Sequence, residues 1–264
     1  MAVVRAQFRK AGSLRYISHL DLMRLLARAL RRAHLPMVYS QGFHPLPRFS
    51  LAAALAVGIT SSGEIGDFLL GEPVQPEEFC RRCNEALPAG VQFTKACLIP
   101  ETAPSLGRLL AAATYVCGLL PPAETARPSA AHGAPPGGVS IQAADLRLAC
   151  ERLLSAATWP VERPGKEGLR RLDIRPGIYG LQVSEADDPR VLRAVQEGGW
   201  PLPARAVAMQ IGAGEGHTVR PEEVLRALGL PAERAWIHRE GLYGWCGRLV
   251  PLLEVTDCRP RNGG

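Results

Sequence analysis

The stretch that decides the fold runs from Val3 to Ala33 and reads VVRAQFRKAGSLRYISHLDLMRLLARALRRA. Its opening residues alternate so that three apolar side chains share one face of an extended chain: Val4, Ala6 and Phe8. This alternation predicts a short strand over Val3–Phe8, ending before the turn at residues 10–12. A helix is predicted to follow, so the chain opens with a strand–helix unit.

The helix is predicted to begin at Ser18. Asp21, three residues later, completes a variant of the capping box, in which both side chains satisfy free backbone N–H groups. The helix runs to about His34, and Pro36 stops it. At about 100° per residue, four arginines and Asp21 share an arc of roughly 100°; the arginines are Arg24, Arg28, Arg31 and Arg32. Apolar residues fill the rest of the circumference, so this helix buries a broad face and presents an arginine row.

The charge of the chain is unevenly distributed. Residues 1–63 contain nine Lys or Arg and a single acid, a sum of +8, whereas the remaining 201 residues sum to −2. Clustered positive charge attracts polyanions, and the commonest intracellular polyanion is nucleic acid. A merely solvated face is the alternative, but such faces usually mix both signs. The residues expected to contact nucleic acid are Arg15, Arg24, Arg28, Arg31, Arg32, Phe43, His44 and Arg48.

The order of the predicted elements indicates an α+β fold made of two ferredoxin-like α/β sandwich units. After the first helix, the sequence predicts strands at 49–55 and 64–70, a turn-rich connection at 58–63 between them, a helix at 76–87 and a strand at 91–98. This β-α-β-β-α-β order is the ferredoxin-like one. The second half repeats it more irregularly, with strands at 113–119, 169–174, 179–183 and 204–211 and helices at 143–154 and 221–228.

These elements divide the chain into two predicted domains. A basic domain covers residues 1–100, and a second domain covers 101–258. The second domain carries a Pro/Ala/Gly-rich insertion at 120–139, and residues 259–264 form a frayed tail. No stretch has the apolar length of a membrane span, and seven cysteines without a disulfide pattern indicate a reducing cytoplasm.

A constrained loop follows the first helix, with the sequence Gly42-Phe43-His44-Pro45-Leu46-Pro47-Arg48. Glycine permits a positive φ, and the two prolines fix φ and restrict the residues before them. Such a loop holds Phe43 and His44 outward against a ring or a phosphate, or it buries Phe43 as a rigid connection. The sequence leaves both interpretations open.

Acid–base chemistry has few candidates in this chain. Imidazole titrates near neutrality, so His19 and His44 are candidate acid–base groups, although each also has a structural explanation. Asp21 and Asp173 are the candidate carboxylates. No Ser/His/Asp ordering or nucleophile elbow supports hydrolysis.

A metal site is not expected. Cys80 and Cys83 have metal-like spacing, but both fall on the apolar stripe of a predicted helix and lack further ligands. The sequence also has no three-cysteine cluster of the kind that holds a radical-chemistry iron–sulfur centre. A glycine-rich phosphate loop is likewise missing.

A second polar site is predicted on the strand at 169–174. Period 2 places Arg171, Asp173 and Arg175 on one face. They form either an exposed, self-paired ladder or a second site that extends the first patch, with Asp173 orienting an arginine or acting as a base.

Several motifs together resemble the radical SAM-associated family of unknown function: Ser18-His19-Leu20-Asp21, Arg28-Ala29-Leu30-Arg31-Arg32-Ala33, Leu35-Pro36, Tyr39-Ser40-Gln41-Gly42-Phe43-His44-Pro45 and Asn84-Glu85-Ala86-Leu87-Pro88. The similarity is dense over residues 1–98 and resumes at 171–175 and 220–225. Members of that family occur as separate proteins or as the C-terminal part of a larger radical SAM protein. Relatives often carry Asn at the position of His44.

The resemblance implies a partner for a radical SAM enzyme, and the charge distribution suggests what this chain contributes. We expect an accessory, RNA-binding subunit that presents an RNA or ribonucleoprotein substrate to that enzyme. The chain itself is expected to bind no cofactor, with the iron–sulfur cluster and S-adenosylmethionine on the partner. The alternatives are a stand-alone RNA-modifying or RNA-processing enzyme and a protein-docking subunit without RNA contact. Whether the chain is an enzyme stays open, and a non-catalytic partner is favoured.

Overall fold

The structure, a computed structural model, describes residues 1–120, 142–165, 168–214 and 216–256. Most of the predicted insertion at 120–139 and all of the predicted tail at 259–264 lie outside the described residues.

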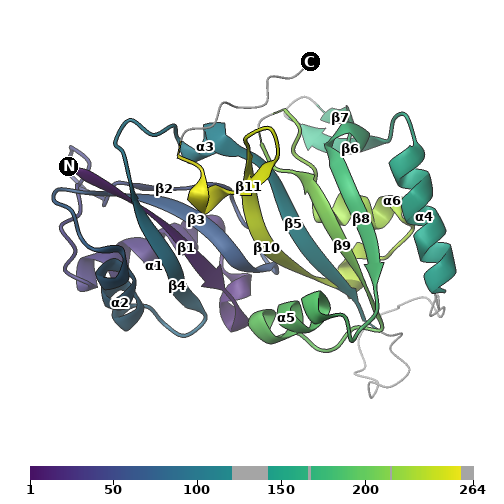
Figure 1. Ribbon diagram of the computed structural model, residues 1–264, viewed down its shortest axis with the longest axis horizontal. Helices are drawn as coiled ribbons and strands as arrows, with labels where there is room; N and C mark the ends of the chain where they lie inside the picture. The colour runs from purple at the N-terminus through teal and green to yellow at the C-terminus, as the bar shows by residue number, and fades with distance from the viewer. Residues whose placement is uncertain (121–141, 166–167, 215, 257–264) are drawn as a thin grey trace.

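The protein has a mixed α+β fold built on one nine-stranded sheet (Figure 1). The strands of this sheet are β1 (Ala2–Lys10), β2 (Phe49–Leu51), β3 (Thr60–Leu70), β4 (Val91–Ile99), β5 (Leu110–Leu119), β8 (Ile178–Ser184), β9 (Arg205–Gly212), β10 (Ala235–Trp245) and β11 (Leu249–Pro251). Their order is β4-β1-β3-β10-β5-β9-β8, with β2 paired to β3 and β11 paired to β10. A separate two-stranded sheet consists of β6 (Pro160–Gly165) and β7 (Gly168–Asp173).

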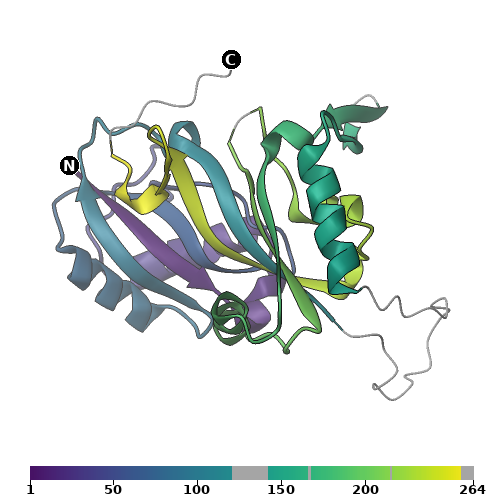
Figure 2. The ribbon, with the colours of Figure 1, turned by 45° about the vertical axis from the view of Figure 1, so that its right-hand side comes forward.

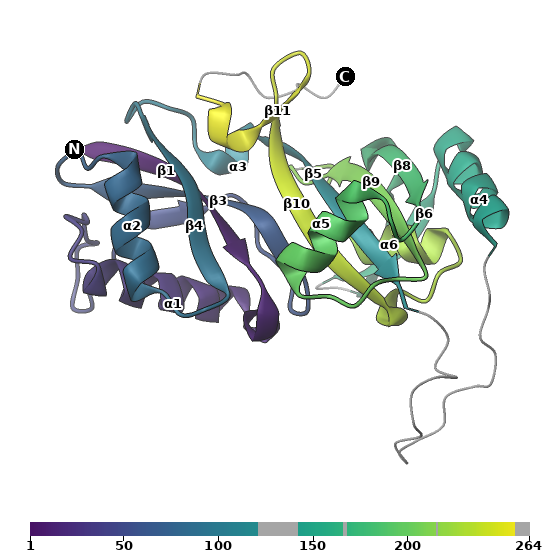
Figure 3. The same cartoon turned by 60° about the horizontal axis from the view of Figure 1, so that its bottom comes forward.

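The helices are α1 (His19–Arg32), α2 (Pro76–Ala86), α3 (Leu106–Leu109), α4 (Ala143–Ser155), α5 (Pro189–Gly198) and α6 (Pro221–Ala227). In Figure 2 and Figure 3, α1 and α2 lie against the end of the nine-stranded sheet that the first hundred residues form. Helices α4 and α6 lie toward the opposite end of the sheet. Helix α5 packs on the opposite face from α4 and α6, because it contacts Val116, whereas the neighbouring Cys117 faces their core.

The first core lies wholly within the first hundred residues. Four phenylalanines form its centre, with ring centroids 5.2–5.5 Å apart: Phe8, Phe68, Phe79 and Phe93. Helix α1 buries Leu22, Leu26 and Leu30 against this cluster. Apolar spacing at i, i+4 and i+8 therefore fixes which side of α1 faces solvent.

Three elements, β3, β10 and α5, differ from the sequence-based prediction. Residues 58–63 are predicted as a connection, but β3 already begins at Thr60. The eleven-residue strand β10 is not predicted, and neither is α5. The errors at β3 and β10 have one cause, because β10 pairs in parallel with the start of β3, through His238 with Thr60 and Arg239 with Ser61. Local pattern carries no signal for a pairing across that separation, and the charges inside β10 hide a buried strand.

This pairing joins the two halves of the sheet and buries an ion pair. The Arg239 guanidinium lies 3.0 and 3.1 Å from the two carboxylate oxygens of Glu64. It also donates to the hydroxyl of Tyr115 at 3.0 Å and to the carbonyl of Ala54 at 3.1 Å. Burial disfavours the charged guanidinium, but Glu64 and Tyr115 together more than offset this and raise the pKa of Arg239.

A polar chain occupies the other face of the same junction. The buried His238 ring contacts the Thr60 hydroxyl through Nδ1 at 2.9 Å and the Ser62 hydroxyl through Nε2 at 3.0 Å. Trp200 donates its indole N–H to Thr60 at 2.7 Å. The carboxylate of Glu197, at the end of α5, lies 3.7 Å from Nε2, and its interaction with His238 lowers the pKa of Glu197. The junction is therefore hydrogen-bonded on both faces.

No helix within the described ranges is both long enough and apolar enough to span a lipid bilayer.

The substitution Glu64→Gln should lower the free energy of unfolding by about 3–5 kcal/mol, because it leaves the buried Arg239 charge without a counter-ion. Urea denaturation at neutral pH measures this change. The control is Glu78→Gln, which breaks an exposed ion pair with Arg81 and should cost less than about 1 kcal/mol. Equal denaturation midpoints for the two variants would show that the buried pair does not hold the junction.

Candidate nucleic-acid interface

Helix α1 is positioned by local signals at both ends. At its start, the Ser18 hydroxyl accepts the backbone N–H of Asp21 at 3.2 Å and donates to the Asp21 carboxylate at 2.7 Å. At its end, Ala33 is the C-cap, and His34 adopts a positive φ of 50°. These caps and the buried leucines set the rotation of α1, so its polar side points outward.

The arginine row of α1 faces solvent. Arg24, Arg28, Arg31 and Arg32 are all exposed. Among the described carboxylates, Asp21 alone contacts the row, at 3.2 Å from Arg24. That pair is exposed on both sides and therefore weak. No ion pair between described residues joins this row to a carboxylate of the second half of the chain.

Arg31 ties the helix to the loop that follows it. Its Nη2 donates to the carbonyl of Pro45 at 2.8 Å, and its guanidinium lies 6.0 Å from the centre of the Tyr39 ring. The loop closes on itself, since Ser40 and Leu46 share a backbone hydrogen bond of 2.9 Å and the Ser40 hydroxyl accepts the Leu46 N–H. Arg31 thus holds the loop beside the arginine row.

The tip of this loop projects into solvent. Gly42 has a φ of 128°, a conformation that favours glycine, and the side chain of Phe43 that follows is fully exposed. His44 is also exposed. Of the two conformations that the sequence allows, the loop adopts the one that holds Phe43 outward. The surface therefore presents an apolar ring next to cations, the combination found in single-stranded nucleic-acid binding sites.

The two flanking arginines differ from each other. Arg15 is half-buried, with its guanidinium 4.0 Å from the centre of the Trp200 ring and 5.0 Å from that of Tyr16. Its Nε is buried without a hydrogen-bond partner. Arg48 is exposed, while its backbone bonds Val38 and Leu69. Arg48 therefore extends the basic surface, and Arg15 mainly packs against aromatic rings.

The candidate acid–base residues His19, Asp21 and His44 do not form a hydrogen-bonded group in the described part of the chain. Nδ1 of His19 is buried without a hydrogen-bond partner, whereas His44 lies on the exposed loop. Hydrogen bonds from Ser18, with further help from Arg24, hold the pKa of Asp21 below its usual range. An ionised carboxylate already engaged by these groups is a poor base near neutral pH. No hydrogen bond or ion pair between described atoms links His19, Asp21 and His44.

The second polar site lies on and just after β7, far from α1 (Figure 1). Oδ1 of Asp173 accepts the backbone N–H groups of Trp159 and Arg175, at 2.7 and 3.0 Å. The Arg175 guanidinium donates to the carbonyls of Leu154, at the end of α4, and of Ile178. Arg171 is exposed. Asp173 and Arg175 thus bond backbone groups of neighbouring segments.

No group of three or more His, Cys, Asp or Glu in the described part of the chain is arranged to hold a metal ion. The free cysteines within that part are Cys80, Cys83, Cys97, Cys117 and Cys150. Burial raises the pKa of the Cys83 thiol and, to about 11, that of Cys150, so neither resembles a reactive thiolate.

The chain belongs to a family described as uncharacterized protein conserved in bacteria (DUF2344), which matches residues 4–221. The matched region includes α1 and the loop that carries Phe43, and it ends at the first residue of α6. No curated protein matches the chain. Family membership assigns no chemistry, so a function has to be argued from the geometry of the surface.

The substitution Phe43→Ala should change the free energy of unfolding by less than about 0.5 kcal/mol, because the exposed ring makes no packing contribution. Phe68→Ala, in the phenylalanine cluster, should cost about 3–5 kcal/mol. Thermal unfolding of both variants measures the difference. A large loss for Phe43→Ala would mean that the loop packs inward in solution.

Proposed function

We propose that this protein is an accessory, RNA-binding subunit that presents an RNA or ribonucleoprotein substrate to a radical SAM enzyme. The observation that carries the RNA part is the uncovered arginine row of α1 beside the fully exposed Phe43. Arginine bonds phosphate in a planar, bidentate manner, and an aromatic ring stacks on an unpaired base. The two are found together on one surface, as single-stranded RNA recognition requires.

The spacing of the row suits a polyanion. Arg24 and Arg32 lie about 12 Å apart along the helix axis, from a rise of about 1.5 Å per residue. Salt screens charges over about 8 Å under physiological conditions, so neighbouring arginines act together on the same phosphates. The hydrogen bond from Arg31 to the carbonyl of Pro45 keeps the loop in one position relative to the helix. This preorganisation reduces the entropy lost when RNA binds.

The triple variant Arg24→Glu, Arg28→Glu, Arg31→Glu should bind RNA at least about tenfold more weakly. Its plot of log affinity against log salt should flatten by about 2, since each lost phosphate contact removes about 0.7 for a single strand. Fluorescence anisotropy with a labelled single strand of about 20 nucleotides, longer than one typical binding site, measures both quantities.

The matched control is Arg108→Glu, Arg152→Glu, Arg226→Glu, which has the same charge change on exposed helical positions of the second half. This control should retain most of the affinity. Equal affinities for wild type and a folded α1 triple variant would reject RNA binding by α1. An equal loss in both triple variants would indicate that net charge alone drives binding.

The radical SAM partner is proposed from the motif resemblance over residues 1–98. The iron–sulfur cluster and S-adenosylmethionine are expected on that partner, and this chain would supply the substrate-binding surface. A stand-alone enzyme that uses His19, Asp21, His44 or Asp173 is the alternative. It requires turnover by the purified chain without iron, sulfide or S-adenosylmethionine.

Protein docking without RNA is a second candidate, favoured by one observation. Several large apolar side chains are exposed around α1 and its loop: Tyr16, Leu20, Tyr39 and Leu46. Arginine mixed with aromatic and apolar side chains is also typical of protein interfaces.

Co-purification with the radical SAM protein, with and without nuclease, distinguishes the two candidates. If RNA bridges the two proteins, nuclease should release the partner, and the α1 triple variant should fail to recover it. If the proteins dock directly, the partner should remain bound after nuclease. Failure to co-purify under either condition would remove the radical SAM partner from the proposal.

Each half of the sheet is further proposed to be a ferredoxin-like unit. The order β4-β1-β3-β2 in the first half supports this, and so does β10-β5-β9-β8 in the second. Both orders place the fourth and third strands of a β-α-β-β-α-β unit on either side of its first. Helices α2 and α6 occupy the same place in the two units, before the last strand.

A cytoplasmic location is also proposed, and it rests on the cysteines. Five free thiols in the described part of the chain fit a reducing compartment. One observation opposes this proposal: Cys246 is disulfide-bonded, and disulfides are rare in reducing compartments.

A further inference from the structure

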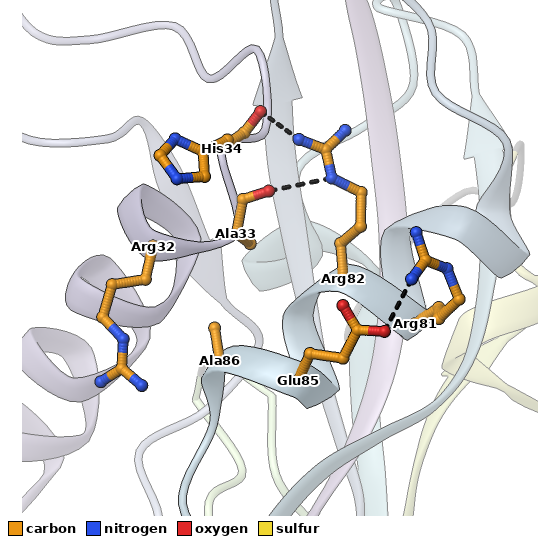
Figure 4. A pocket seen from close by; sticks show the side chains of 7 residues that line it. All are labelled: Arg32, Ala33, His34, Arg81, Arg82, Glu85 and Ala86. Carbon is orange, nitrogen blue, oxygen red and sulfur yellow. Dashed lines mark hydrogen bonds and ion pairs between the residues drawn. The ribbon is translucent and has the colours of Figure 1, made fainter.

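A hollow lies between the end of α1 and the side of α2 (Figure 4). Its volume is about 350 Å³, and it is lined by Arg32, Ala33, His34, Arg81, Arg82, Glu85 and Ala86. The two helices approach here through Ala33 and Ala86, whose side chains are too small to fill the space between the longer ones. The hollow therefore follows from two alanines surrounded by charged residues.

Arg82 is held in place on the α2 side. Its Nε donates to the carbonyl of Ala33 at 2.9 Å, and its Nη2 donates to the carbonyl of His34, as the dashed lines in Figure 4 show. Nη1 has no acceptor among the described residues. These bonds satisfy carbonyls at the end of α1 and fix the guanidinium in one orientation.

Two carboxylates, those of Glu78 and Glu85, bond the guanidinium of Arg81. Arg81 forms two hydrogen bonds of 2.8 Å with Glu78 and one of 2.6 Å with Glu85. Glu85, the carboxylate in the lining, is thus directed toward Arg81 (Figure 4). Arg32, on the α1 side, is exposed and has no hydrogen-bond or ion-pair partner within the described ranges.

The balance of charge in the hollow is positive. Three guanidinium groups line it against one carboxylate, and the end of α1 contributes about half a negative charge. Glu78 lies outside the lining but is paired with Arg81, so the net charge with Glu78 included is about +0.5. Two of the cations, Arg32 and Arg82, keep donors without acceptors. Unused guanidinium donors are the groups that bond phosphate oxygens.

We propose that this hollow between α1 and α2 binds a phosphate group. Nη1 of Arg82 donates to its oxygens, and the exposed His34 lies at the rim. The exposed Arg32 side chain, whose guanidinium points away from Arg82 in Figure 4, turns toward the phosphate and donates to it as well. The volume corresponds to about a dozen water molecules at about 30 Å³ each, which leaves room for a sugar attached to the phosphate.

This proposal deepens the proposed RNA function, because Arg32 belongs to both the arginine row and the hollow. A phosphate seated there marks one end of the RNA path along α1. The same chemistry occurs in the internal phosphates of RNA, in a terminal 5′-phosphate and in a free nucleotide. All three bind through the same oxygen atoms, so the test has to separate them.

The first probe is inorganic phosphate, titrated against the full chain and followed by NMR of the arginine Nε–H groups. Arg32→Gln should weaken phosphate binding at least about fivefold, because it removes one of two charged donors. The matched control, Arg152→Gln, removes an exposed arginine from the last turn of α4, and it should change binding less than twofold.

Glu85→Gln gives a change of opposite sign. It removes the one carboxylate of the lining and leaves Arg81 paired with Glu78. Phosphate should then bind at least about threefold more tightly, because a nearby like charge is gone. If, in folded variants, Arg32→Gln does not weaken phosphate binding and Glu85→Gln does not tighten it, the phosphate site is overturned.

Further probes identify the source of the phosphate. A nucleoside 5′-monophosphate that binds more tightly than inorganic phosphate indicates a free nucleotide or a terminal phosphate. A 5′-phosphorylated RNA that binds more tightly than its 5′-hydroxyl form, with the difference lost in Arg32→Gln, assigns the hollow to an RNA end. Equal binding of the two RNAs, both weakened by Arg32→Gln, assigns it to an internal phosphate.

These outcomes separate the two proposals. If the α1 triple variant binds RNA normally while Arg32→Gln still loses inorganic phosphate, the RNA function fails and the phosphate site stands. If the triple variant loses RNA while inorganic phosphate never responds to Arg32→Gln or Glu85→Gln, the phosphate site fails alone.

Discussion

The parallel pairing of β10 with the start of β3 is the constraint on which the rest of the structure depends. It joins two groups of strands into one sheet, through a contact between residues about 178 positions apart (His238 with Thr60). Such a contact is entropically costly, and it places an arginine and a glutamate in the interior. The hydroxyl of Tyr115, the carbonyl of Ala54 and the polar chain around His238 satisfy these groups, so the junction is specific as well as tight.

Burial of the leucine side of α1 places the arginine row on the surface. The phenylalanine cluster takes the leucine face of α1, and the helical period leaves the arginines on the other side. Arg15 adds a link between halves, because its guanidinium stacks on Trp200, which in turn donates to Thr60 at the junction. The start of α1 is thereby held to the central strands, and the basic surface has a fixed place on the sheet.

Local features of the fold could be predicted from the sequence, whereas non-local ones could not. The limits of α1 and its arginine row follow from one cap and one period, both encoded within fifteen residues. The early start of β3 depends on β10, which no local pattern reveals. Arg175 illustrates the same limit, because its acceptor at Leu154 lies on another helix. The outward position of Phe43 depends on Arg31 and Pro45, a contact that the alternation of residues does not encode.

The charge count of the first 63 residues overstates the charge on the surface. Arg5 is buried against Asp67, and Lys10 is buried with its ammonium group near the carbonyls of Arg15 and Ile17. Burial lowers the pKa of Lys10 as well. The exposed cations that remain are gathered on α1 and just after its loop. An electrostatic field at the surface depends on this local density within about a Debye length, so α1 is more basic locally than the net charge of +6 for the whole chain suggests.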